Sequence, residues 1–205
     1  MSNLLRTAAS AGVLTGSAIA ARRGVPAWDS AAFSDINGLP DALQYPLWVP
    51  MQFGSLGGAL TAGAFVGLTR NRRLGTEVAV AGTVAWIAAK AIKALVQRDR
   101  PAAEVATTEL RIGAADSGLG FPSGHAAVAT TTSALIARGT DGHVNAAAAF
   151  VSALVGVSRI HVGAHYPLDV VGGWALGALV ADLTSAAFAH GLERDHAGVG
   201  SLVPC

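Results

Sequence analysis

Three short segments of this chain carry residue types that could hold a phosphate group and cleave it from its ester. They are Lys93-x6-Arg100-Pro101, Pro122-Ser123-Gly124-His125 and Ser158-Arg159-x5-His165-x3-Asp169. Together they supply three cations, two histidines, a carboxylate and a glycine turn. Cations neutralise phosphate oxygens, histidines can attack phosphorus or transfer protons, and a carboxylate can orient a histidine. Each segment alone is weak evidence, but the combination predicts chemistry at a phosphate.

The second segment predicts a loop that turns into a helix. Gly124 gives the backbone the freedom to bring several N–H groups together, and the start of a helix adds partial positive charge that attracts an anion. Ser123 is a typical N-cap residue, and capping is compatible with phosphate binding at the same place. His125 would then face the anion. A lone histidine is more often structural, but beside a phosphate cradle we favour a general acid.

The third segment admits two interpretations. His161, His165 and Asp169 are spaced by four residues, so an unbroken helix would present them as three metal ligands on one face. Pro167 argues against such a helix, because proline disfavours helical geometry at the preceding Tyr166. A turn there would bring Asp169 back to the ring of His165, where it would fix the tautomer and stabilise the imidazolium. We therefore expect no metal site, and we expect His161 to be structural or to lie at the rim.

The first segment sets cations at the end of an apolar stretch. Lys90 and Lys93 are three residues apart, and hence on the same side of a helix. An ionisable residue at the centre of a membrane helix costs roughly 2.5–3.5 kcal/mol, so two so close together suggest a use. Lys90 suits a lysine that extends to the lipid headgroups, whereas Lys93 is a candidate phosphate ligand. Arg100 strengthens this interpretation, because the proline after it ends the helix and fixes a charged side chain at the mouth of the bundle.

Arg98 lies two residues before Arg100 and has two interpretations. It could be one more phosphate contact. The interpretation that the sequence favours is a surface arginine paired with Asp99 or Asp116.

The elements that must position these residues are those of a membrane protein. The chain has 205 residues, of which 52% are hydrophobic and 13% charged, whereas a soluble domain usually has about 25% charged residues. The formal net charge is +1 and no basic block stands out, which argues against nucleic acid as a partner. The single cysteine, Cys205, is the last residue, so the sequence predicts no internal disulfide and no cysteine metal site.

Apolar segments of roughly the length that a bilayer requires, about 20 residues, divide the chain. They predict an all-α, polytopic membrane bundle of about six transmembrane helices in a single domain, residues 1–205. We place them near residues 4–21, 47–69, 76–97, 123–138, 143–160 and 168–190. The first is either an anchor helix or, because Ala18-Ile19-Ala20 resembles a cleavage site, a signal peptide ending at residue 21. The sequence leaves the oligomeric state open.

Two further patterns concern how these segments pack. Trp28, Ala32, Phe33 and Ile36 recur at helical spacing, which predicts an amphipathic helix at the membrane interface, with an ordinary loop as the alternative. Glycines at small-xxx-small spacing would let helix backbones approach closely, although an Ala/Gly-rich chain also produces such pairs by chance. The pairs are Gly54 with Gly58, Gly63 with Gly67, and Gly173 with Gly177.

The positive charges between segments predict the orientation. Arg70, Arg72 and Arg73 follow the second segment and Arg138 follows the fourth, so the positive-inside rule assigns both turns to the cytoplasm. A helix count then predicts that residues 93–122 and the turn around His165 face outward from the cytoplasmic (inner) membrane. The dissenting charges are Arg22 and Arg23, partly offset by Asp29, Asp35 and Asp41.

In order and spacing, the three segments resemble the signature of the type 2 phosphatidic acid phosphatase superfamily, which also includes vanadium-dependent haloperoxidases and bacterial acid phosphatases. The resemblance covers residues 93–169 without a substitution, and the combination is highly specific. It implies an all-helical core and metal-independent hydrolysis of phosphate esters with no cofactor. It also implies His165 as the nucleophile, Asp169 as its partner and His125 as the acid. The phosphate ligands that it implies are Lys93, Arg100, Ser123, Gly124 and Arg159.

Within that superfamily the chain looks most like the compact bacterial membrane branch, which acts on phosphatidate, phosphatidylglycerol phosphate or polyprenyl diphosphates. The expected partners are therefore the lipid bilayer and a lipid phosphate. The residues permit two displacements: His165 attacks phosphorus while His125 protonates the leaving oxygen, and water activated by His125 then cleaves the phosphohistidine. One alternative is a membrane carrier that only binds lipid phosphate, which would need the cations but not the histidines. The other, a vanadate-dependent haloperoxidase, fits an apolar chain poorly.

Overall fold

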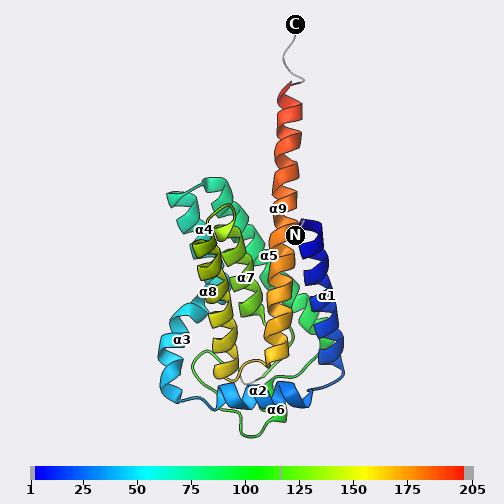
Figure 1. Ribbon diagram of the computed structural model, residues 1–205, viewed down its shortest axis with the longest axis vertical. Coiled ribbons are helices and arrows are strands. Elements are labelled where there is room, and N and C mark those ends of the chain that lie inside the picture. The colour runs from blue at the N-terminus through cyan, green and yellow to red at the C-terminus, as the bar shows by residue number, and fades with distance from the viewer. Residues whose placement is uncertain (1–2, 116, 201–205) are drawn as a thin grey trace.

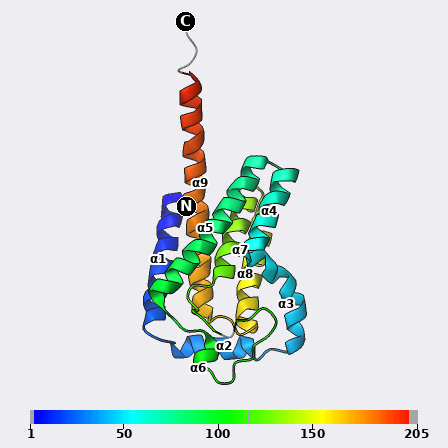
Figure 2. The same ribbon diagram turned by 180° about the vertical axis from the view of Figure 1, so that it is seen from behind.

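The computed structural model describes residues 3–115 and 117–200 as helices joined by loops, with one isolated bridge between Asp99 and Leu119; Cys205 lies outside the described residues. The all-α prediction is confirmed. In chain order the helices are α1 (Asn3–Arg22), α2 (Ala27–Asn37), α3 (Gln44–Met51), α4 (Leu56–Thr69), α5 (Arg72–Val96), α6 (Pro101–Glu104), α7 (Gly124–Ala137), α8 (Gly142–His161) and α9 (Pro167–Gly200), with 3-10 turns at Asp41–Leu43 and Gln52–Gly54 (Figures 1 and 2).

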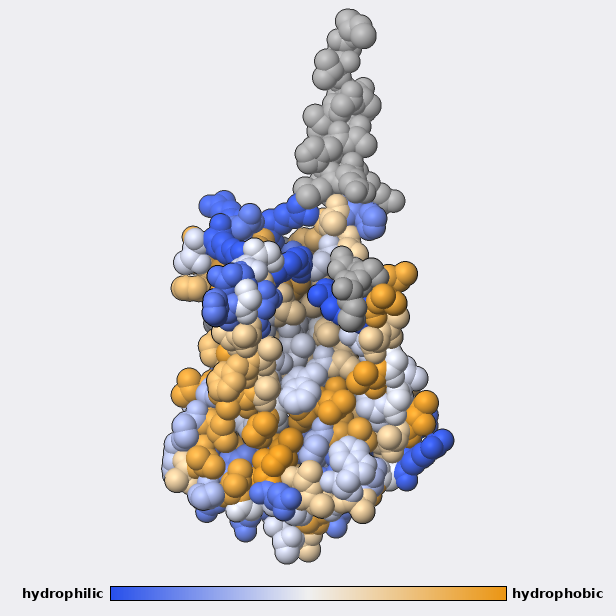
Figure 3. All heavy atoms as spheres, viewed as in Figure 1, coloured by the Kyte–Doolittle hydropathy of each residue, from blue (hydrophilic) through white to orange (hydrophobic). Residues whose placement is uncertain are grey.

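The long apolar helices make this a multi-pass membrane protein. Within the described residues, four helices are long and apolar enough to cross a bilayer: Leu4–Arg22, Arg72–Val96, Gly142–His161 and Pro167–His190. Apolar residues cover the middle of the face in Figure 3, and hydrophilic ones gather mainly towards the end that holds the α4–α5 turn. Of the other two predicted segments, 123–138 forms α7 and the second half of 47–69 forms α4, and each of these helices has 14 residues. α7 packs against α5, α8 and α9, so most of its surface faces protein.

The predicted continuous segment 47–69 is wrong. The chain there forms α3, a 3-10 turn and α4, with a break at Ser55, whose backbone is extended and whose side chain accepts a hydrogen bond from Gly58 N at 2.8 Å. A serine in this conformation caps the following helix, which separates α4 from α3. The break brings the 3-10 turn against the start of α7. A Cβ added at Gly54 would lie 2.6 Å from the carbonyl oxygen of His125.

Glycines allow the close approach of two helix pairs. A Cβ at Gly75 of α5 would lie 2.5 Å from the backbone of both Gly63 and Gly67 of α4. In the same way, a Cβ at Gly177 of α9 would lie 2.4 Å from the carbonyl oxygen of Ala127 in α7. These contacts are backbone to backbone, so the glycine spacing seen in the sequence reflects packing in both pairs.

The predicted amphipathic helix exists as α2, which lies across one end of the bundle (Figure 1). Its buried face differs from the predicted one: Trp28 is 56% exposed, whereas Asp29, Phe33 and Asn37 are buried. Phe33 packs edge-on against Tyr166 with ring centroids 5.3 Å apart. α2 therefore presents a carboxylate, an aromatic ring and an amide to the protein interior.

The two ends of the bundle carry different features. The α4–α5 and α7–α8 turns, which hold Arg70 to Arg73 and Arg138, lie at the end opposite α2 (Figures 1 and 2). Arg138 pairs there with Glu77 at 2.9 Å. α2, α6 and the loops on either side of α6 form the other end.

Candidate active site

The three sequence segments meet at the end of the bundle covered by α2. Lys93 lies in the last turn of α5, Arg100 is the N-cap of α6, and Arg159 lies in the last turn of α8. The two histidines come from the first turn of α7 and from the short link between α8 and α9. The positive charges of all three cations act on both His125 and His165, so helix ends that are distant in sequence form one cluster.

Backbone carbonyls hold the three cations in place. Lys93 Nζ donates to Leu119 O at 2.8 Å and to Gly120 O at 2.6 Å. Arg100 Nη1 donates to Ala164 O at 3.1 Å. Arg159 is nearly fully buried, and its Nη1 donates to Gly113 O at 2.8 Å. Such anchors fix cations before an anion arrives, which lowers the cost of ordering them on binding.

The start of α7 has the predicted loop-to-helix form. Ser123 is the N-cap, with its hydroxyl accepting from Ala126 N at 3.4 Å, and Gly124 and His125 are the first helical residues. The first N–H groups of a helix lack intrahelical acceptors and attract an anion. Ser123 N donates to Asp169 O at 2.8 Å, which ties this helix start to α9.

His165 and Asp169 face each other across the turn that Pro167 introduces. Pro167 is the first residue of α9, and the separation between His165 Nδ1 and Asp169 Oδ2 is 3.5 Å. This is longer than the usual hydrogen bond of about 2.7–3.2 Å. With Nδ1 turned towards the carboxylate, Nε2 lies on the opposite edge of the ring, as a nucleophile would require.

The surroundings of His165 favour its neutral form. Burial lowers the pKa of His165 well below its ordinary value, and the charges of Lys93, Arg159 and Arg100 lower it further. A neutral imidazole has a lone pair on one nitrogen and can act as a nucleophile. The same cations that would bind a phosphate therefore also keep the attacking group unprotonated.

Arg98 is where the sequence interpretation was wrong. It is not at the surface but 4% exposed, and among the described residues its carboxylate partners do not include Asp99; the other candidate, Asp116, lies outside the described residues. Its Nη1 donates to Asp169 Oδ1 at 2.9 Å, and its Nη2 donates to Asp29. From the sequence, Asp29 is only one of the acidic residues that offset the charges of Arg22 and Arg23. Asp29, Phe33 and Asn37 recur every four residues and so share one face of α2, and this spacing from Phe33 is the signal that could have identified a buried carboxylate.

His161 has a structural place. It is fully buried, and its Nδ1 lies 3.2 Å from the carbonyl oxygen of Ile36, which joins α8 to α2. Its own carbonyl accepts from Asn37 Nδ2 at 2.9 Å. In the described ranges, no group of three or more His, Cys, Asp or Glu side chains is arranged to hold a metal ion.

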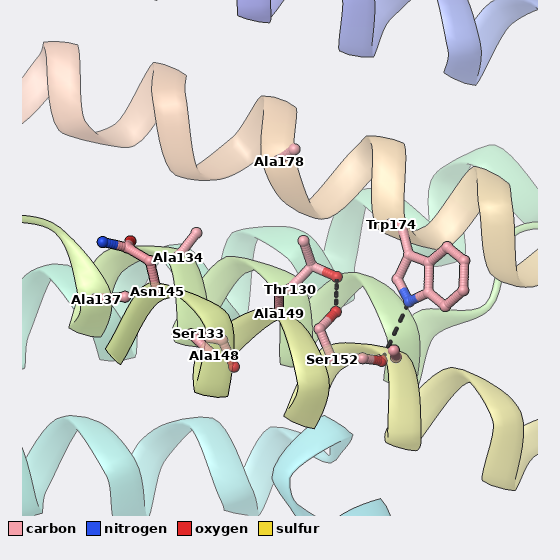
Figure 4. Close-up of a pocket in the computed structure, with 11 residues that line it drawn as sticks. Thr130, Ser133, Ala134, Ala137, Asn145, Ala148, Ala149, Ser152, Trp174 and Ala178 are labelled. Carbon is pink, nitrogen blue, oxygen red and sulfur yellow. Dashed lines mark hydrogen bonds between the residues drawn. The ribbon is translucent and has the colours of Figure 1, made fainter. Parts of the chain in front are cut away.

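A cavity of about 480 Å³ lies between α7, α8 and α9, away from the cluster (Figure 4). Its walls are mostly alanine side chains, and Trp174 Nε1 donates to Ser152 O at 3.2 Å. Ser152 and Thr130 share a hydrogen bond of 2.6 Å. The wall contains no charged side chain and no histidine, so this cavity is not the phosphate site.

Comparison with known proteins identifies the family and agrees with the fold. A sequence profile described as the PAP2 superfamily matches residues 74–190. An undecaprenyl-diphosphatase of Sulfolobus acidocaldarius is 28% identical over 115 residues, which is 56% of this chain and 55% of that protein. A decaprenylphosphoryl-5-phosphoribose phosphatase of Mycobacterium tuberculosis is 39% identical over 118 residues, or 56% of this chain and 62% of that protein. The chain thus spans little more than half the length of these curated relatives.

Two solved structures share the arrangement of helices. The crystal structure of LpxE from Aquifex aeolicus gives a TM-score of 0.69 at 23% identity, covering 76% of this chain and 93% of that one. The structure of a transmembrane PAP2 type phosphatidylglycerolphosphate phosphatase from Bacillus subtilis gives a TM-score of 0.73 at 21% identity. The match covers 89% of this chain and 95% of that one. At this identity the likeness shows the fold, and the profile, which matches more than half of the chain, shows the family. The chain belongs to the PAP2 superfamily.

Proposed function

We propose that this protein hydrolyses the phosphate monoester or diphosphate of a membrane lipid, without a metal ion, through a phosphohistidine at His165. The observation that carries the proposal is a buried His165 that faces Asp169 and lies among three anchored cations. The curated relatives, a polyprenyl diphosphatase and a decaprenylphosphoryl phosphoribose phosphatase, support a lipid phosphate as substrate. The related lipid A 1-phosphatase of Rhizobium johnstonii, 41% identical over 72 residues, supports the same class.

In the first step, Nε2 of His165 donates its lone pair to phosphorus, and the bond between phosphorus and the leaving oxygen breaks. Burial and the three cations lower the pKa of His125 before substrate binds, but the bound phosphate anion offsets these charges, so His125 can hold a proton and give it to that oxygen. Asp169 faces Nδ1 and stabilises the positive charge that the imidazole gains. The products are the alcohol or lipid phosphate, a phosphohistidine, and a neutral His125.

In the second step, water attacks the phosphohistidine from the side that the leaving group has left. His125 takes the proton from this water, the bond between phosphorus and Nε2 breaks, and inorganic phosphate leaves. His165 is neutral again and His125 is protonated, so the cycle closes.

The cations stabilise both transition states. Phosphoryl transfer spreads negative charge over three equatorial oxygens, and the role we assign to Lys93, Arg100 and Arg159 is to neutralise them. Ser123 and Gly124 supply the cradle at the start of α7, where backbone N–H groups attract the same oxygens. Spontaneous hydrolysis of phosphate monoesters is so slow that enhancements up to ~10²¹ are known, which is why several preorganised charges are needed.

The site belongs, in this proposal, at the outer headgroup level of the cytoplasmic membrane. Exposed aromatic side chains support this depth of the site in the membrane. They are Trp28 of α2 and Tyr45 and Trp48 of α3, and both helices lie in the half of the bundle that holds the cluster. Such residues favour the membrane–water interface. The arginines of the α4–α5 turn support a cytoplasmic position for the opposite end. A phosphate at this depth can meet the cations while its lipid tail stays in hydrocarbon.

The test is phosphate release by detergent-purified protein in EDTA, across phosphatidate, phosphatidylglycerol phosphate and polyprenyl diphosphates. We expect turnover of at least one of these lipids, and none with His165→Ala. Arg138→Gln, which removes an ion pair at the far end of the bundle, serves as the control and should retain full activity. Binding of the lipids without release would identify a carrier. Activity that disappears in EDTA and returns with zinc or magnesium would contradict the metal-independent mechanism.

A further inference from the structure

A buried arginine links two buried carboxylates behind the candidate nucleophile. Arg98 Nη1 donates to Asp169 Oδ1 at 2.9 Å, and Nη2 donates to Asp29 Oδ2. Both aspartates are fully buried. We propose that Arg98 and Asp29 are positioning residues, which fix the carboxylate of Asp169 and through it the ring of His165. This inference rests on the proposed function.

Every oxygen of the two carboxylates accepts a hydrogen bond. Asp169 Oδ2 accepts from Tyr166 N at 2.9 Å, and Oδ1 accepts from Arg98. Asp29 Oδ1 accepts from Leu168 N at 2.8 Å, and Oδ2 accepts from Arg98. A carboxylate bound at both oxygens cannot rotate without losing a buried hydrogen bond. The remaining acceptor capacity of Asp169 Oδ2 is therefore held in the direction of His165.

Arg98 is itself fixed from two sides. Its guanidinium lies 4.6 Å from the centre of the Tyr166 ring, and its carbonyl oxygen accepts from Gly120 N at 2.7 Å. A Cβ at Gly120 would come within 3.0 Å of Asp169 Oδ2, so the loop before α7 closes over the carboxylate. These contacts and its two hydrogen bonds hold the guanidinium beside the carboxylates.

Asp29 determines the net charge of the three groups. Arg98 and Asp169 alone would form a neutral pair, which would offer an imidazolium little stabilisation. With Asp29 the set carries one net negative charge, and the dehydrated interior makes that charge more effective at His165. Asp29 comes from α2, outside residues 74–190 that match the superfamily profile, so this assignment rests on the structure alone.

The alternative is that the three groups only tie α2 to α9. A buried ion pair is weak evidence for stability, because the cost of dehydrating the charges can exceed their attraction. The two roles differ in what they change. A tie affects folding, whereas a positioning network affects the chemical step and leaves ground-state phosphate binding alone.

The experiment compares Arg98→Gln, Asp29→Asn and the double variant in purified protein. We expect Arg98→Gln to lower kcat by about 10- to 100-fold, as loss of an orienting partner typically does. KM and the inhibition constant of inorganic phosphate should stay within about two-fold, because neither residue is a phosphate ligand in this assignment. Asp29→Asn should lower kcat less. The double variant should be no worse than Arg98→Gln, since the two residues act through the same carboxylate.

The outcomes separate this inference from the proposed function. An unchanged kcat in Arg98→Gln, with His165→Ala inactive, overturns the inference alone; turnover by His165→Ala overturns the proposed function. A rise in the phosphate inhibition constant that parallels the loss of activity would make Arg98 a phosphate ligand instead. If Arg98→Gln does not fold, the inference is tested with Asp29→Asn, which keeps the shape of the side chain. An unchanged kcat in Asp29→Asn then overturns the inference. Arg138→Gln, which also removes one arginine from an ion pair, should leave kcat unchanged.

Discussion

His165 gains its proposed nucleophilicity from cations on different helices and its orientation from a carboxylate nearby in the chain. Lys93 and Arg159 come from different helices, yet both favour the neutral ring. Asp169 lies four residues along the chain and faces the other ring nitrogen. In the proposed mechanism, the imidazole is therefore neutral before it attacks phosphorus, and the carboxylate stabilises the positive charge that it gains.

Replacing the orienting carboxylate should remove most of the activity. Asp169→Asn keeps the size of the side chain but loses its charge, so the imidazolium formed on attack is no longer stabilised. In serine proteases the equivalent change lowers kcat by about 10⁴, and we expect a loss of comparable order here. The measurement is kcat for phosphate release from a lipid phosphate.

Asp182→Asn is the matched control for this prediction. Asp182 lies on the same helix, is also largely buried and pairs with Arg6, far from the cluster. Its substitution should leave kcat unchanged while lowering stability. Equal losses of kcat in both variants would mean that the effect comes from a damaged α9 and not from the orientation of His165.

At the residue scale, the sequence predicted the members of the cluster but not their support. The motifs identify His125, His165 and Asp169 because their spacing is local and their types are specific. Arg98 and Asp29 are 69 residues apart, and the local sequence around either residue does not predict that the two pair. Pairing between such residues depends on how α2 folds across the bundle, which is a tertiary property.

At the scale of elements, apolar length predicted the long helices well and the short ones poorly. α5, α8 and α9 agree with the predicted segments, because a run of apolar residues of spanning length has few alternatives to a helix in lipid. The predicted segment 47–69 failed because hydropathy does not detect a cap such as Ser55. The buried face of α2 was missed for a related reason: its inner positions include polar residues that have partners in the fold.

The close packing of α7 on α9 gives a prediction at this scale. Gly177→Ala should destabilise the protein, although alanine normally favours a helix by up to about 1 kcal/mol over glycine. The added Cβ would lie 2.4 Å from Ala127 O, and overpacking of this kind costs about 1–3 kcal/mol. Thermal unfolding in detergent should show a lower midpoint.

Gly16→Ala provides the comparison, because nothing lies within 4 Å of a Cβ at that position in α1. It should leave the midpoint unchanged or raise it slightly. If Gly177→Ala also leaves the midpoint unchanged, α7 and α9 are less tightly apposed than described.

At the scale of the whole molecule, the basic turns of the bundle are separated from the candidate active site. The α4–α5 and α7–α8 turns lie at one end and the cluster at the other (Figure 1). Which end of the bundle faces the cytoplasm depends on how the protein is inserted in the membrane. The positive-inside rule predicts that the cluster faces outward. Arg22 and Arg23 lie at the cluster end, and their positive charges favour the opposite orientation.

Cysteine labelling tests this orientation. In a Cys205→Ser background, Ala115→Cys lies in an exposed loop at the cluster end, and Gly142→Cys lies at the exposed start of α8, with no neighbour within 4 Å of its Cβ. An impermeant maleimide should label the Ala115→Cys protein in intact cells and the Gly142→Cys protein only after permeabilisation. The reverse pattern would place the proposed activity in cytoplasmic lipid metabolism.

The central claim is a covalent phosphohistidine at His165, and direct trapping tests it. Purified protein is mixed rapidly with a radiolabelled lipid phosphate that it turns over, quenched in alkali, in which phosphohistidine survives, and mapped by peptide mass spectrometry. We predict label on His165 that appears before inorganic phosphate and is absent from His165→Ala, which should not turn over. Label on another residue, or continued phosphate release by His165→Ala, would contradict the account.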